Sequence, residues 1–108
     1  MGVFYTARTI IGYRSKVDES NKEWWAFEDF MGEAKLPLTY ERDPYDGNTF
    51  WIGWGGRGCE KGEYERLNPP SFDDIKAFIQ ETVRPWIDSE LLTLREEDFG
   101  VWTTMLGW

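Results

Sequence analysis

Residues 36–54 have the sequence LPLTYERDPYDGNTFWIGW, and this stretch decides the fold that we predict. Residues 36–42 alternate in polarity, and residues 49–54 are rich in aromatic and β-branched side chains; both patterns are typical of strands. Its middle, residues 43–48, concentrates Asp, Pro, Gly and Asn, the residue types that form turns. We therefore predict a β-hairpin with strands at 36–42 and 49–54. Pro37 indicates that the first strand lies at a sheet edge, because proline donates no ladder hydrogen bond.

One amphipathic helix is predicted on each side of this hairpin. Before it, residues 21–34 repeat apolar side chains at helical spacing, and Ser20 with Glu23 fits a capping box. After it, residues 71–84 carry an apolar stripe that begins behind a second capping residue, Ser71. Two acidic residues follow Ser71 in the first turn, where the helix dipole favours negative charge.

Two further strands lie outside these helices. Residues 3–14 place apolar or β-branched side chains at every second position, and residues 101–106 form the last strand. Pro85 should end or kink the second long helix near Arg84, and a short helix is predicted over 88–94. The fold class is α+β in the order β-α-β-β-α-β, a single domain over residues 1–108. A four-stranded antiparallel sheet with two helices on one face, ferredoxin-like or similar, fits this order; a generic α+β sheet with another strand order is the alternative.

Composition excludes several classes of function. The 108 residues include 20 acidic and 12 basic ones, for a net charge of -8, with no histidine and one cysteine. Without histidine there is no His-based acid/base catalysis and no His-containing metal site. We therefore predict no enzyme, no cofactor and no metal. The negative charge argues against direct binding to nucleic acid. The absence of a long apolar run or signal peptide, together with the lone Cys59, predicts a cytoplasmic protein without a membrane span.

The acidic residues concentrate in two blocks, residues 18–33 and 86–108, whereas residues 1–17 carry a net charge of +3. Acidic surfaces steer association with basic partners, and exposed Trp and Tyr anchor protein interfaces. We predict a small acidic binding protein that docks on a basic surface of a nucleic-acid-handling protein. Solubilising surface charge is the simpler alternative. The predicted partner-binding residues are Asp88, Glu90, Glu96, Glu97 and Asp98.

A glycine-rich segment, residues 54–66, suggests another function. Its four glycines favour a mobile loop whose amides could bind phosphate beside stacking side chains. The alternative function is therefore binding or sequestering of a nucleotide-like small ligand. A flexible turn without a ligand is the simpler interpretation. The candidate ligand-binding residues are Trp54, Arg57, Lys61, Tyr64 and Arg66.

The N-terminal sequence adds a resemblance. Met1-Gly2-Val3-Phe4-Tyr5 and Gly12-Tyr13, with the small size and the acidity, resemble small uncharacterised bacteriophage accessory proteins. The resemblance covers the first dozen or so residues and the general composition. It implies a role in the host cytoplasm, such as inhibition of host defence by anti-restriction or anti-CRISPR activity. It carries over no catalytic residues.

Overall fold

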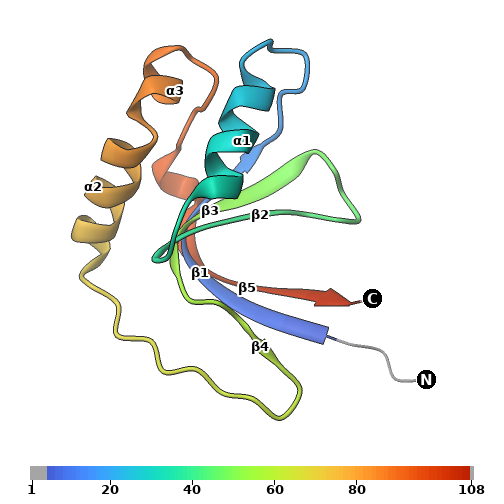
Figure 1. The fold of residues 1–108 in the computed structure, drawn as a ribbon. Helices are drawn as coiled ribbons and strands as arrows, with labels where there is room; N and C mark the ends of the chain where they lie inside the picture. The colour runs from blue at the N-terminus through green and yellow to red at the C-terminus, as the bar shows by residue number, and fades with distance from the viewer. Residues whose placement is uncertain (1–4, 108) are drawn as a thin grey trace.

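The computed structural model describes residues 5–107 (Figure 1). The first residues of the predicted strand at 3–14 and most of the phage-like N-terminal motif therefore lie outside the described residues. The described part forms an α+β fold with an antiparallel sheet and helices, so the predicted class is confirmed. Its elements are β1 (Tyr5–Lys16), α1 (Trp24–Glu33), β2 (Leu38–Arg42), β3 (Thr49–Gly55), β4 (Cys59–Glu60), α2 (Phe72–Thr82), α3 (Arg84–Asp88), η1 (Glu96–Asp98, a 3₁₀-helix) and β5 (Phe99–Gly107).

The long strand β1 lies at the centre of the sheet. It pairs antiparallel with β3 on one side and with β5 on the other, and β2 pairs with the outer edge of β3. The edge position that Pro37 predicts for the first hairpin strand is confirmed. The sheet has five strands where the sequence predicts four, because β4 pairs with β1 at Thr6 and Ala7. A two-residue strand has no sequence periodicity of its own, so only its partner reveals it.

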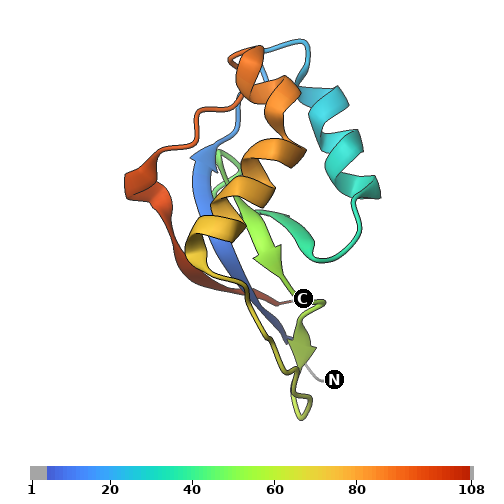
Figure 2. The same cartoon turned by 90° about the vertical axis from the view of Figure 1, so that its left-hand side faces the viewer.

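The helices pack on one face of this sheet (Figure 2). Trp24 and Phe27 of α1, together with Ile75 and Ile79 of α2, are fully buried in one apolar cluster with side chains of β1, β2 and β3. Trp86 of α3 packs against α1, with its ring centroid 5.6 Å from that of Phe27. The three helices therefore form one continuous layer over a shared core.

The predicted short helix at 88–94 is wrong. The chain forms α3 directly after α2, with Pro85 in the first turn of the new helix. Proline fits this position because the first helical amides need no partner within the helix. The helix ends at Asp88, and Glu90 adopts a left-handed backbone conformation with φ of 65°. In the segment that follows, Leu92 is buried in the hydrophobic core.

The two predicted helix caps have different outcomes. The Ser71 hydroxyl accepts a hydrogen bond from the backbone N–H of Asp74 at 3.1 Å, so this cap is confirmed. The capping box at Ser20 and Glu23 is wrong, because α1 begins only at Trp24. The Ser20 hydroxyl instead donates to the carboxylate of Asp18, which forms a local turn.

Replacing Ser71 by alanine should therefore lower the free energy of unfolding by about 1 kcal/mol, because one helix N–H loses its partner. The matched variant Ser20→Ala should change it by less than about 0.5 kcal/mol, as expected at an exposed site without a capping role. Urea denaturation of both variants measures the difference. Equal losses in the two variants would contradict this account of the caps.

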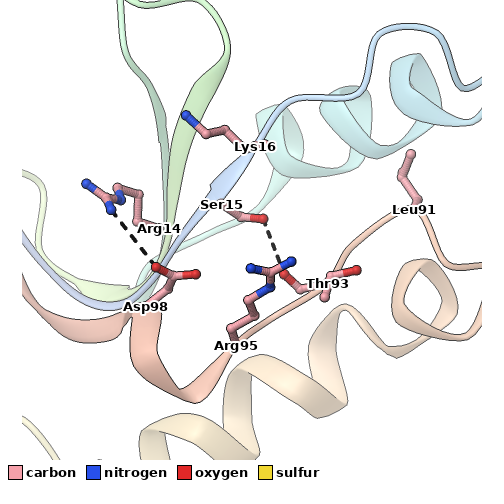
Figure 3. Close-up of a pocket in the computed structure, with 7 residues that line it drawn as sticks. All are labelled: Arg14, Ser15, Lys16, Leu91, Thr93, Arg95 and Asp98. Carbon is pink, nitrogen blue, oxygen red and sulfur yellow. Dashed lines mark hydrogen bonds and ion pairs between the residues drawn. The ribbon is translucent and has the colours of Figure 1, made fainter.

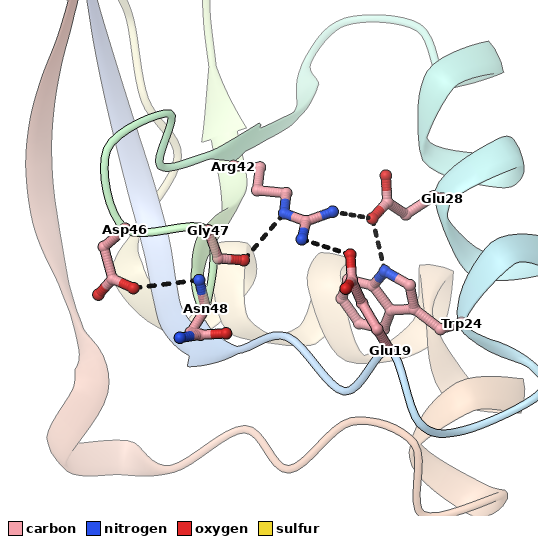
Figure 4. A network of polar contacts seen from close by, with 7 residues as sticks. All are labelled: Glu19, Trp24, Glu28, Arg42, Asp46, Gly47 and Asn48. Carbon is pink, nitrogen blue, oxygen red and sulfur yellow. Dashed lines mark hydrogen bonds and ion pairs between the residues drawn. The ribbon is translucent and has the colours of Figure 1, made fainter.

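An arginine on β2 ties the hairpin to the helical layer (Figure 4). Arg42 donates to the carboxylates of Glu28 and Glu19, at 3.0 and 2.5 Å, and to the carbonyl oxygen of Gly47 at 3.0 Å. The hydrogen bond to Glu19 is the main cause that raises the pKa of Arg42 above its ordinary value. Two residues of the acidic block at 18–33, Glu19 and Glu28, therefore stabilise the fold.

Candidate functional site

The structure divides the predicted partner-binding block at 88–98 into two groups. Near η1, each acidic residue has a basic partner: Glu96 pairs with Lys76, Glu97 with Arg95 at 3.7 Å, and Asp98 with Arg14 at 4.0 Å. Asp88 is the last residue of α3 and Glu90 follows it by two residues, and both are exposed. Within residues 5–107, neither has a basic side chain within 4.0 Å. The five predicted residues therefore fall into two groups, and in the described chain only Asp88 and Glu90 have no basic side chain nearby, although the contacts of Glu97 and Asp98 are long.

Charge is instead divided between the two layers of the fold. The three α-helices carry seven acidic and two basic residues, whereas the five strands carry four basic and two acidic ones. The helices have their apolar side chains in the core, so their charged residues lie on the outside of the molecule. The outer surface of the helical layer is therefore acidic, with a net charge of -5 on the three α-helices against +2 on the five strands.

A set of exposed carboxylates on this layer forms no ion pair within residues 5–107, although two of them, Asp73 and Asp74, lie in the first turn of α2, where the helix dipole favours negative charge. None of them accepts a hydrogen bond within the described part of the chain. We name this set the outer helical acids: Glu23, Asp29, Glu33, Asp73, Asp74, Asp88 and Glu90. Carboxylates in the loops behave differently. Those of Asp43 and Asp46, for example, accept from nearby backbone N–H groups.

A tryptophan lies among the outer helical acids. Trp25 on α1 is 64% exposed, while its neighbour Trp24 is fully buried in the core. Asp29 follows Trp25 by one helical turn, and residues four apart are neighbours on a helix surface. The arrangement can offer a partner both an aromatic anchor and negative charge.

The glycine-rich segment has an internal ligand for its amides. The carboxylate of Glu65 accepts hydrogen bonds from the backbone N–H groups of Arg57 and Gly58, at 2.9 and 3.2 Å. A side chain at Gly56 would collide with the same carboxylate, because a Cβ there would lie 2.3 Å from one of its oxygens. The amides that the sequence assigns to a phosphate are therefore occupied by Glu65.

The candidate ligand-binding side chains of this segment do not gather at those amides. Trp54 packs against the core on the helical side of the sheet. Arg57, Lys61 and Arg66 are exposed, and Tyr64 is 90% exposed. A further contact that Arg57 does make is through its backbone, since its carbonyl oxygen accepts a hydrogen bond from the guanidinium of Arg8.

The face of the sheet opposite the helices carries polar groups that the sequence analysis misses. Glu41 on β2 is 8% exposed, and its carboxylate accepts from the hydroxyl of Thr104 on β5. Because β3 and β1 lie between these strands, the contact requires a strongly curved sheet. Hollows of about 390 and 220 Å³ are both lined by Glu41. No local signal marks Glu41 as buried, because the next residue, Arg42, is also charged and the two together are typical of a solvent-exposed strand end.

A third hollow, at the end of β1, has three basic residues among the seven that line it (Figure 3). Arg14 and Lys16 come from β1, and Arg95 from the segment that precedes η1. The sequence signal is the net charge of +3 in residues 1–17, to which Arg95 is added from the other end of the chain.

Comparison with known proteins gives no family. No protein-family model matches the sequence, and neither the curated proteins nor the solved structures yield a match. Within residues 5–107, no helix is both long and apolar enough to cross a membrane. The same residues contain no group of three or more Cys, Asp or Glu side chains placed to hold a metal ion.

Proposed function

We propose that this protein is a small, non-enzymatic acidic binding protein that docks through its helical layer on a basic surface of another protein. One observation carries the proposal. The outer helical acids are seven exposed carboxylates without an ion pair or hydrogen bond in the described chain, and Trp25 is exposed among them. They replace the block at 88–98 as the predicted docking residues, and retain Asp88 and Glu90 from it.

In the free protein, the outer helical acids have no counter-charge from the described chain in contact with them. Like charges on one surface repel each other and destabilise the compact state, and nearby lysines or arginines would offset this repulsion. Here the described chain supplies no basic side chain within 4.0 Å of any of them. A basic partner supplies the missing counter-charges and accelerates association through electrostatic steering.

Proteins that handle nucleic acid are the partner class that fits this surface best. Their binding sites present lysine and arginine side chains that neutralise a closely spaced array of phosphates. A rigid layer of carboxylates can occupy such a site in place of the phosphates. We further propose that the protein acts in the cytoplasm of a host cell against a defence protein of this class, as its phage-like N-terminal sequence implies.

We also propose that the fold is ferredoxin-like. The strand order supports this arrangement, because β2, β3, β1 and β5 are neighbours in that order and each pair is antiparallel. β4 and α3 are additions to it. The alternative function, a nucleotide-like ligand in residues 54–66, requires such a ligand to displace Glu65 from the Arg57 and Gly58 amides. The geometry therefore favours docking by the helical layer.

The test compares two variants with the same change in net charge. Asp29→Lys with Glu33→Lys reverses two outer helical acids on α1, and Glu60→Lys with Glu97→Lys reverses two exposed acids elsewhere. Immobilised wild-type protein should capture nucleic-acid-binding proteins from a bacterial lysate at low salt. The α1 variant should capture about tenfold less, corresponding to about 1.4 kcal/mol, and the control variant should match the wild type.

Competition separates this function from non-specific charge attraction. An excess of duplex DNA should release the captured proteins, because DNA and the helical layer occupy the same basic site. Raising the salt concentration should also release them, and the α1 variant should show a flatter salt dependence. Equal capture by the two charge-reversed variants, or capture that DNA does not reduce, would contradict the proposed function.

A further inference from the structure

A cavity of about 410 Å³ lies between the end of β1 and the segment that leads into η1 (Figure 3). Its walls carry three basic side chains, Arg14, Lys16 and Arg95, and one acidic side chain, Asp98. The lining therefore has a net charge of +2 in a chain whose net charge is -8. The volume falls within the range of small-molecule sites in proteins.

Two local features build this cavity. Arg14 and Lys16 are two residues apart on β1, so both project from the same face of the strand. Ser15 lies between them and donates a hydrogen bond to the carbonyl oxygen of Thr93 at 3.3 Å. This bond joins the segment that carries Arg95 to the end of β1. The basic residues thus come from two distant parts of the sequence that the fold holds together.

The three basic groups are only weakly engaged within the described chain. Arg95 lies 3.7 Å from Glu97, and both side chains are largely exposed, so this pair contributes little to stability. Arg14 lies 4.0 Å from Asp98, whose side chain is partly buried, and this distance is long for an ion pair. Lys16 donates to the neutral hydroxyl of Thr49 at 3.2 Å. All three can therefore turn to an anion without breaking a strong contact.

Arg14 is also oriented by an aromatic ring. Its guanidinium carbon lies 5.2 Å from the ring centroid of Trp102 on β5, a cation–π contact. The Trp102 ring is itself fixed, because its Nε1–H donates to the carbonyl oxygen of Gly12 at 3.1 Å. A positioned guanidinium loses less freedom when it binds a ligand.

We propose that this pocket binds the phosphate group of a small phosphate monoester, such as a sugar phosphate or a nucleoside monophosphate. A phosphate monoester carries a charge of about -1.5 to -2 at neutral pH, which matches the net charge of the lining. Arginine presents its N–H donors in a fork that matches the oxygens of phosphate. This site is separate from the outer helical acids, so it does not depend on the proposed docking function.

The test titrates the isotope-labelled protein with ribose 5-phosphate at low salt and follows backbone amides by NMR. Amides of residues 14–16 and 93–98 should shift saturably. Ribose alone should cause no such shifts, and adenosine 5′-monophosphate should cause shifts in the same residues. Inorganic phosphate should bind more weakly than either monoester, because it makes no contact beyond the phosphate group.

Two variants locate the effect. Arg95→Gln should weaken the binding of ribose 5-phosphate about tenfold, as expected for loss of a charged hydrogen bond. Lys35→Gln removes the same charge from the exposed segment between α1 and β2, outside the lining of the pocket, and should leave the affinity unchanged. The proposal is overturned if ribose 5-phosphate causes no saturable shift at 14–16 and 93–98, or if both variants weaken binding equally. Binding of inorganic phosphate as tightly as ribose 5-phosphate would overturn the assignment to a monoester.

Discussion

Replacement of Gly12 by alanine should lower the free energy of unfolding by about 3 kcal/mol, at the upper end of the range for overpacked sites. Gly12 on β1 pairs directly with Gly53 on β3. A Cβ at Gly12 would lie 2.1 Å from the carbonyl oxygen of Ile52 and 2.5 Å from the Cα of Gly53. Both are backbone atoms of a central strand, so the added methyl group must push two strands apart.

The matched control for this variant is Gly32→Ala in α1. No heavy atom lies within 4 Å of a Cβ built at Gly32, and the residue is exposed. Alanine should therefore stabilise the helix there, by about 0.5–1 kcal/mol. Urea denaturation measures both changes. A loss below about 1 kcal/mol for Gly12→Ala would show that the strands can separate easily, contrary to the close approach described here.

The sheet is strongly curved where Gly12 and Gly53 pair. Close contact of β1 and β3 at Gly12 and Gly53 accompanies the curvature that brings Thr104 on β5 to Glu41 on β2. Ile10 is fully buried although it lies on the face without helices. The uncovered face is therefore concave, which is why Glu41 is buried rather than solvated.

Replacement of Phe27 by alanine should lower the free energy of unfolding by about 3–5 kcal/mol, the usual cost of a large cavity in a core. Phe27 is fully buried, and its ring lies within 6.0 Å, centroid to centroid, of four other aromatic rings. They belong to α1, α3, β2 and β3, so the side chain joins four elements. The four residues are Trp24, Tyr40, Phe50 and Trp86.

A second phenylalanine provides the control for Phe27. Phe72 begins α2, is 51% exposed, and has one aromatic neighbour, Phe99, at 5.5 Å. Phe72→Ala should cost about 1 kcal/mol, as expected for a partly exposed site. Chemical denaturation monitored by circular dichroism compares the two variants. Similar losses for both would place the centre of the core away from α1.

Local sequence patterns predict most of the regular elements here. The hairpin at 36–54 and the helix behind Ser71 follow from turn residues, periodicity and a capping residue, which are all local signals. The patterns miss β4, which forms only by pairing with the distant residues Thr6 and Ala7. They also miss α3, because a proline that follows one helix is equally compatible with the first turn of the next helix, where Pro85 lies.

The candidate sites are less predictable for the same reason. The run Glu96-Glu97-Asp98 is acidic in sequence, but two of its basic partners, Lys76 and Arg14, come from other elements of the fold. The glycine-rich segment suggests free amides, and only the fold shows that Glu65 occupies them. Free surface charge is what remains after the ion pairs have formed, so it depends on tertiary structure.

Oxidative footprinting of the protein bound to a captured nucleic-acid-binding protein tests the docking surface most directly. Hydroxyl radicals oxidise accessible aromatic side chains, and the free protein should be modified at both Trp25 and Tyr64, which are highly exposed. In the complex, we expect oxidation of Trp25 to fall to the level of the buried Trp24, with Tyr64 unchanged. Protection of Tyr64 while Trp25 remains reactive would place the interface on the glycine-rich segment and contradict docking by the helical layer.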